Sequence, residues 1–94
     1  DVSHSMLTSN YFNDDFYDFA KKIIPYTAHI HMGDASGFNG EGLQIGDGSI
    51  DFKKLGKILT SSSQKISFIP EIWQGHKNDG EGFWIALNRL NNII

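Results

Sequence analysis

The stretch Thr27-Ala-His-Ile-His-Met32 alternates in side-chain character, which is typical of a β-strand with one covered face. In this strand His29 and His31 lie on one face, while Ile30 and Met32 lie on the other. A second strand is predicted over residues 66–73, Ile-Ser-Phe-Ile-Pro-Glu-Ile-Trp, whose nearly continuous apolar character indicates a strand covered on both faces. Pro70 would end its pairing, because proline lacks the N–H that a ladder needs.

Three helices are predicted around these strands from apolar residues that recur on one helical face. The first covers residues 12–23, with Asn13 as its N-cap and Pro25 beyond its end. The second covers residues 52–59 after Asp51, and the third covers residues 83–94. Helix and strand therefore alternate along the chain, which predicts an α/β fold with parallel strands and crossover helices.

Length and composition limit the classes of function. The chain has 94 residues, and 8 Lys and Arg against 11 Asp and Glu give a net charge of −3. A net negative charge argues against nucleic acid as the expected partner, because binding phosphates requires a basic face. The absence of cysteine excludes disulfides and thiolate metal sites. No apolar run approaches the roughly 18 residues of a membrane helix, so no membrane partner is expected.

Three side chains are predicted to meet at the carboxyl ends of the strands, where parallel α/β folds gather their functional residues. Asp1 would follow one strand, His31 lies at the end of the second, and Glu71 lies near the end of the third. Neighbouring parallel strands are about 4.8 Å apart, so these groups can converge on one ion. Carboxylate and imidazole ligands suit Mn²⁺, Mg²⁺, Co²⁺ or Zn²⁺.

Each of these residues also has a purely structural interpretation. A histidine on a strand, such as His29 or His31, is often a hydrogen-bonded interior residue. Glu71 in an apolar strand is costly to bury without a partner, unless it already lies in solvent at the strand end. The spacing that puts both histidines on one face favours the ligand interpretation.

Two further segments suggest ligand contacts. Six glycines fall within residues 33–48, which predicts a loop that either approaches a ligand closely or only makes turns with positive φ. Before the third helix, His76 and Lys77 fit a phosphate held at a helix N-terminus. Asp79 and Glu81 oppose such a phosphate, so a solvated loop is an equal alternative.

The motifs together resemble the C-terminal part of xylose-isomerase-like barrels, the superfamily of sugar isomerases and epimerases. The matching segments are Asp1-Val-Ser-His4, His29-Ile-His-Met-Gly-Asp34, Gly46-Asp-Gly-Ser-Ile-Asp-Phe52 and Phe68-Ile-Pro-Glu71. The stretches around residues 40–46 and 73–78 also look like the barrel domains attached to sialic-acid-synthase-type proteins. The resemblance implies that residues 1–94 are one partial domain, from the end of strand six through helix eight of a (β/α)₈ barrel. The chain would then begin in the middle of its barrel.

The resemblance also implies a function and a set of roles. The parent would be a cytoplasmic, divalent-metal-dependent sugar or sugar-phosphate isomerase or epimerase, moving a proton next to a carbonyl through an enediolate. Asp1, His31 and Glu71 would be the metal ligands, and Glu71 and His4 the catalytic residues. The substrate-binding residues would be His4, His29, Asp34, His76 and Lys77.

Some features leave other functions open. Gly37 stands where some epimerases carry an arginine, and a fourth ligand is not within the chain. A non-catalytic carbohydrate-binding or regulatory module, such as one of a sialic-acid-synthase-type protein, is therefore the alternative. A nuclease like the apurinic endonuclease is a weaker one, because the chain lacks a basic surface. The predicted open sheet edges also leave a homo-oligomer open.

Overall fold

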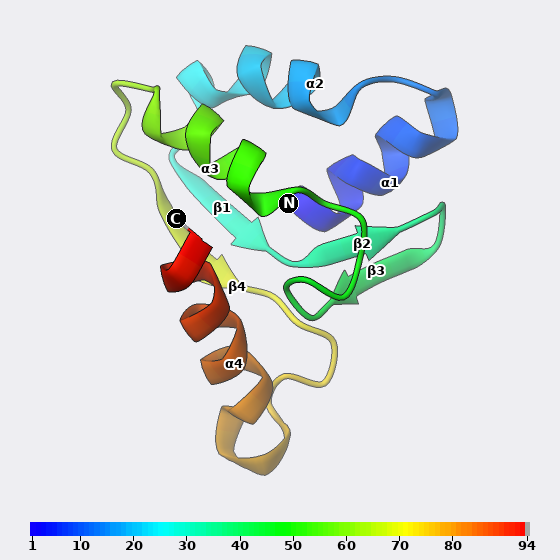
Figure 1. The fold of residues 1–94 in the computed structure, drawn as a ribbon, viewed down its shortest axis with the longest axis vertical. Coiled ribbons are helices and arrows are strands. Elements are labelled where there is room, and N and C mark those ends of the chain that lie inside the picture. Colours follow the sequence, from blue (N-terminus) through cyan, green and yellow to red (C-terminus); the bar gives the residue numbers. More distant parts are fainter. Residues whose placement is uncertain (94) are drawn as a thin grey trace.

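A short parallel sheet lies at the centre of the fold. In the computed structural model, which describes residues 1–93, strand β1 (His29–Met32) pairs in parallel with β4 (Ser67–Pro70). Helix α3 (Phe52–Thr60) makes the crossover between them, and its N-cap Asp51 accepts a hydrogen bond from the Lys54 amide, as predicted (Figure 1). The predicted α/β class is therefore confirmed.

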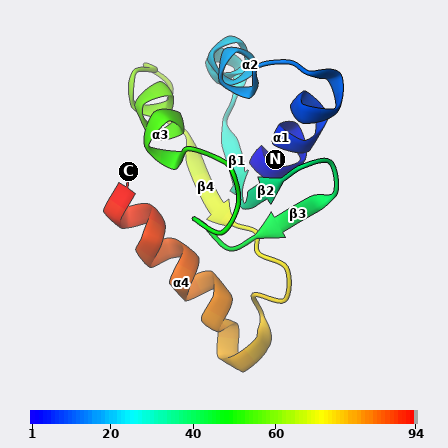
Figure 2. The ribbon, with the colours of Figure 1, turned by 45° about the vertical axis from the view of Figure 1, so that its right-hand side comes forward.

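The glycine-rich stretch forms a second, separate sheet. Strands β2 (Asp34–Ser36) and β3 (Gly40–Leu43) pair antiparallel, and the chain reverses between them at Gly37, whose φ is 61°. Glycine adopts this left-handed conformation without steric cost. Figure 2 shows this hairpin projecting beside the end of β1 and below helix α1 (Val2–Phe12).

The predicted barrel segment, from strand six through helix eight, is wrong. The structure has a two-stranded parallel sheet and a separate two-stranded antiparallel sheet over residues 1–93. Two parallel strands do not form the curved, continuous sheet of a barrel wall. Asp1 is the N-cap of α1, and its side chain accepts a hydrogen bond from the His4 amide.

The first predicted helix is also corrected. Residue Asn13 does not begin a helix but ends α1, in the left-handed conformation at φ 56°. The next helix, α2 (Phe16–Ile23), is capped by Asp15 and ends before a short 3₁₀ helix, η1 (Ile24–Tyr26). Of the predicted apolar face, Phe16 and Ala20 are buried; Phe12, Phe19 and Ile23 are exposed.

The two central strands differ in burial. In β1, Ile30 and Met32 are buried while both histidines are exposed, which confirms the predicted alternation. Strand β4 is largely exposed, so the prediction of a strand covered on both faces is wrong. Its pairing does end at Pro70.

The last helix, α4 (Lys77–Ile93), closes one side of the core through Ala86 and Leu90, which are fully buried. It contains a left-handed stretch at residues 78–80, so its regular part begins later than Lys77. Ile94, which the predicted helix included, lies outside the described residues. Within residues 1–93, no helix combines the length and apolar character needed to cross a membrane.

Candidate metal centre

Three predicted ligands come together on the surface. Asp1, His31 and Glu71 each offer one ligand atom, and these atoms all lie within 4.8 Å of one another. They come from the N-terminus of α1, from β1 and from the residue that follows β4. Residues far apart in the sequence thus form one exposed cluster, called the triad below.

The parallel register of β1 and β4 positions two members of the triad. His31 pairs with Ile69 and Met32 with Pro70, and just past this last pair the amide of Glu71 donates to the Met32 carbonyl at 2.8 Å. This places the Glu71 carboxylate 2.5 Å from Nδ1 of His31. The strand pairing therefore holds the His31 imidazole and the Glu71 carboxylate in contact at one strand end.

The third member is oriented by a histidine. His4 Nδ1 lies 3.0 Å from the Asp1 carboxylate, and its Nε2 lies 2.5 Å from the carboxylate of Glu41. One imidazole thus bridges a ligand carboxylate and a second acidic group. Histidines and carboxylates linked in this way orient metal ligands in proteins.

The donor set fits a divalent ion of the predicted classes. Ligand oxygen and nitrogen atoms lie about 2.0–2.2 Å from such an ion, so two of them are at most about 4.4 Å apart. The triad atoms, within 4.8 Å, need a movement of less than about one ångström to share an ion. Two carboxylates and an imidazole suit Mn²⁺, Mg²⁺, Co²⁺ and Zn²⁺ alike.

A cavity of about 230 Å³ opens beside the triad. It is lined by Asp1 and Glu71, by both partners of the His4–Glu41 pair, and by Trp73. The sequence analysis missed Glu41 and Trp73. Their only signal was position: Glu41 lies in the segment predicted to be a loop, and Trp73 ends the strand predicted over residues 66–73.

Asp34 serves the fold of the glycine-rich stretch. It is fully buried, and its carboxylate accepts hydrogen bonds from the amides of Ala35, Gly46, Gly48 and Ile50 at 2.8–3.1 Å. The structure thus places this predicted substrate-binding residue inside the protein. The amides of Gly46 and Gly48, which could otherwise bind an anionic ligand, already donate to the Asp34 carboxylate.

The other predicted substrate-binding residues lie in different places. His29 accompanies His31 on the exposed face of β1, where its Nδ1 is 2.7 Å from the Ser67 hydroxyl and the two imidazole rings meet edge to face. His76 and Lys77 are exposed at the start of α4, outside the cavity beside the triad. The structure therefore brings His4 to the triad, and His29 next to it.

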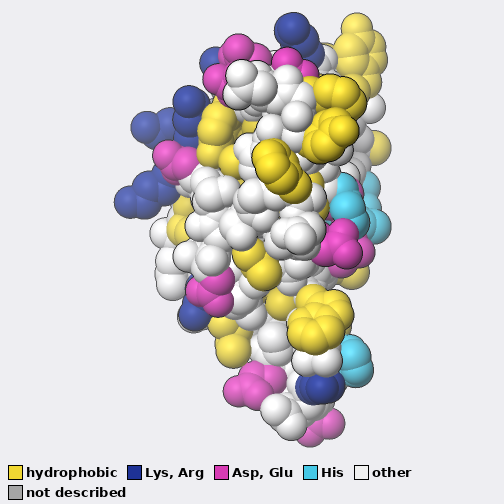
Figure 3. Space-filling model, turned by 90° about the vertical axis from the view of Figure 1, so that its right-hand side faces the viewer, with side chains coloured by type: hydrophobic (Ala, Val, Ile, Leu, Met, Phe, Trp, Pro, Cys, Tyr) yellow, Lys and Arg dark blue, Asp and Glu magenta, His cyan; other side chains and the backbone are white. Residues whose placement is uncertain are grey.

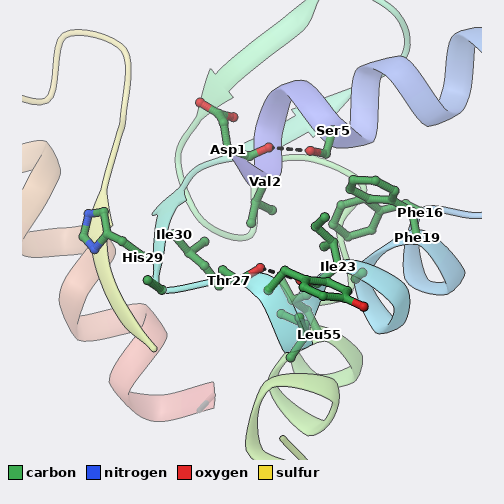
Figure 4. Close-up of a pocket in the computed structure, with 14 residues that line it drawn as sticks. Asp1, Val2, Ser5, Phe16, Phe19, Ile23, Thr27, His29, Ile30 and Leu55 are labelled. Atoms are coloured by element: carbon green, nitrogen blue, oxygen red, sulfur yellow. Dashed lines mark hydrogen bonds between the residues drawn. The ribbon is translucent and has the colours of Figure 1, made fainter. Parts of the chain in front are cut away.

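A second cavity, of about 340 Å³, lies along β1 between α1, α2 and α3. Its lining is mostly apolar, and in Figure 4 the carboxylate of Asp1 points away from Phe16, Phe19 and Ile23. The same view shows His29 apart from these side chains, beside β4. Of these two cavities, the one beside the triad is lined by more acidic and imidazole side chains.

Comparisons with known proteins identify no relative. No family model, no curated protein and no solved structure matches the chain. The function is therefore argued from the geometry of the triad and its neighbours.

Proposed function

We propose that this chain supplies metal ligands and a proton-transfer carboxylate for the isomerisation or epimerisation of a sugar or sugar phosphate. The observation that carries the proposal is the convergence of Asp1, His31 and Glu71 within 4.8 Å. When bound there, a divalent ion would supply polarisation of the sugar carbonyl.

Glu71 is the group placed to move the proton. Its side chain is 55% exposed and borders the cavity beside the triad, so a substrate carbon can reach it. A carboxylate in contact with a bound carbonyl compound can take the proton from the neighbouring carbon and return it. Because the Glu71 carboxylate has two oxygens, one could ligate the ion while the other takes the proton.

His4 and Glu41 would act on the substrate oxygen. His4 already contacts a carboxylate at each of its ring nitrogens, and an imidazole N–H that donates to such a carboxylate can instead donate to a substrate oxygen. A sugar hydroxyl entering the cavity would meet this pair. The carboxylates of Asp1, Glu41 and Glu71 give the cavity a negative charge, which favours a neutral sugar over a phosphorylated one.

A non-catalytic carbohydrate-binding module is the second candidate. The observation that favours it is a group of exposed aromatic side chains, Tyr11, Phe12 and Phe38, around a neighbouring cleft that shares His4 and Glu41 with this cavity. Such a module would bind sugar without exchanging its protons.

The test uses Mn²⁺ affinity and proton exchange in the full chain. Glu71→Gln should weaken Mn²⁺ binding by about tenfold or more, measured by calorimetry, because it removes a ligand charge. With Mn²⁺ present, the unaltered protein should exchange the proton next to the carbonyl of an aldose for solvent deuterium, followed by NMR. Asp79→Asn is the matched control, since Asp79 is an exposed acid outside the triad.

Unchanged Mn²⁺ affinity in both Glu71→Gln and His31→Gln would overturn the metal site. If the protein binds the sugar but exchanges no proton for deuterium, the isomerase proposal is wrong and the chain is a binding module. Because both side chains are exposed, neither substitution should prevent folding.

A further inference from the structure

An aromatic cleft lies next to the cavity beside the triad. Tyr11, Phe12 and Phe38 are 65–70% exposed, which is unusual for three neighbouring large apolar residues. Tyr11 meets Phe12 edge to face with ring centroids 5.0 Å apart, and it meets Phe38 in the same way at 6.2 Å. The cleft that they border has a volume of about 500 Å³.

The cleft is held together by contacts between α1 and the hairpin. The side-chain amide of Asn10 donates to the Gly37 carbonyl at 2.9 Å, which fixes the turn that carries Phe38 against Tyr11. The Ser3 hydroxyl donates to the Asp34 carbonyl and accepts from the Gly42 amide, so the base of α1 is tied to both strands of the hairpin. The aromatic walls are therefore in place before any ligand arrives.

The cleft also has polar lining residues. Thr8, Asn39, His4 and Glu41 line it together with the aromatic rings. Figure 3, which views the molecule from this side, shows hydrophobic side chains gathered on the upper part of the face, with histidine and acidic side chains next to them at its edge. Hydroxyl, amide and carboxylate groups beside an aromatic face match a sugar ring, which presents C–H groups on its faces and hydroxyls around its rim.

The aromatic cleft adjoins the cavity beside the triad, and this indicates what kind of molecule would fill both. His4 and Glu41 line both the aromatic cleft and the cavity beside the triad, so the two spaces meet at this pair. A molecule that fills both would have one sugar ring at the triad and a second at the aromatic rings. The carboxylate of Glu41 at the junction favours a neutral linkage there.

We infer that the aromatic cleft is a second sugar subsite and that the substrate is a neutral disaccharide or longer oligosaccharide. The reducing-end ring lies at the triad, and the next ring packs against Tyr11 and Phe38. This inference rests on the proposed function for the position of the first ring, and it adds the substrate class.

The experiment compares disaccharides with their monosaccharides in the Mg²⁺-loaded full chain. Cellobiose, maltose and lactose are titrated beside glucose and galactose, and binding is followed by NMR shifts of the backbone amides. At least one disaccharide should bind about tenfold more tightly than its monosaccharide, with shifts at Phe38 and Asn39. Phe38→Ala and Tyr11→Ala should remove this preference, whereas Trp84→Ala, which removes an equally exposed aromatic ring on α4, should keep it.

Equal affinities for mono- and disaccharides, or an unchanged preference in Phe38→Ala, would overturn the inference. Shifts at the aromatic cleft with a proline-rich peptide, and with no disaccharide, would do the same and assign the cleft to peptide recognition. Mn²⁺ affinity in Phe38→Ala is measured separately and should equal that of the unaltered chain. A failed subsite is thereby distinguished from a failed metal centre.

Discussion

Gly33 lies against the backbone of Glu71 so closely that a Cβ at residue 33 would stand 2.6 Å from the Glu71 carbonyl oxygen. A methyl group there would push the end of β4 away from β1, because the opposing atom belongs to the backbone and cannot rotate aside. The separation of His31 from Glu71 is thus set in part by the lack of a side chain at residue 33.

Gly33→Ala should therefore weaken Mn²⁺ binding by about tenfold although it alters no ligand. Calorimetry with Mn²⁺ measures the loss. Gly37→Ala is the control. A Cβ at residue 37 would meet no atom within 4 Å, but the φ of 61° makes alanine strained there. This variant should therefore lower stability and leave Mn²⁺ affinity nearly unchanged. Equal Mn²⁺ affinity in Gly33→Ala and the unaltered chain would show that this contact does not set the triad.

Metal binding should stabilise the folded chain, because the three ligands belong to separate elements that an ion would link. At a Mn²⁺ concentration of 100 times its dissociation constant, the free energy of unfolding should rise by about 2.7 kcal/mol. Urea denaturation with and without Mn²⁺ checks this, and EDTA should reverse the gain. A denaturation midpoint that does not respond to Mn²⁺ would argue against a native-state ion site.

His4 should act as a positioning residue for Asp1. Replacing it by Ala frees the Asp1 carboxylate from its imidazole partner, and loss of such a supporting group weakens metal affinity by about 10–100-fold. Glu41→Gln keeps the imidazole in place and should have a smaller effect. Mn²⁺ titrations of both variants test the order, and a larger loss in Glu41→Gln than in His4→Ala would contradict it.

Asp34 should be a major source of stability. Asp34→Ala would leave four buried or half-buried amides without their acceptor, and each unsatisfied group costs about 1–3 kcal/mol. We expect a loss that is a large part of the 5–15 kcal/mol typical of a domain. Urea denaturation measures it. Asp47→Asn, at an exposed carboxylate 3.4 Å from Arg89, should change stability by less than about 1 kcal/mol.

Glycine at position 13 should give a more stable protein than alanine. The Asn13 φ of 56° lies in the left-handed region, where alanine is strained by roughly 1 kcal/mol and glycine is not. Thermal denaturation should therefore rank Asn13→Gly at or above the unaltered chain and Asn13→Ala below it. The reverse order would mean that the end of α1 is held by other contacts.

The elements with a regular pattern were predictable from the sequence. The alternation of β1, the cap of α3 at Asp51 and the parallel crossover all follow from local side-chain spacing. The convergence of Asp1, His31 and Glu71 was also predicted, although the barrel used to explain it was wrong. Because strand ends meet in any parallel pair, the proximity of His31 and Glu71 did not depend on the larger fold.

Other elements left no local signal. The apolar residues of α1 do not follow a helical period, and this helix is held instead by contacts with the hairpin, such as those of Ser3. The hairpin itself is short and rich in glycine, so strand propensity is weak there. The role of Glu41 depends on a partner 37 residues away, and a single sequence does not reveal such a pairing.

The internal carboxylate of Asp34 has a consequence for how a ligand would be received. A glycine-rich segment is usually mobile until something binds it, and ordering it then consumes part of the binding free energy. Here the hydrogen bonds that the Asp34 carboxylate accepts already hold the segment in one conformation. Phe38, Asn39 and Glu41, which line the two cavities, belong to this segment and are therefore held in place before a ligand binds. The affinity of a ligand can then reflect its own contacts alone.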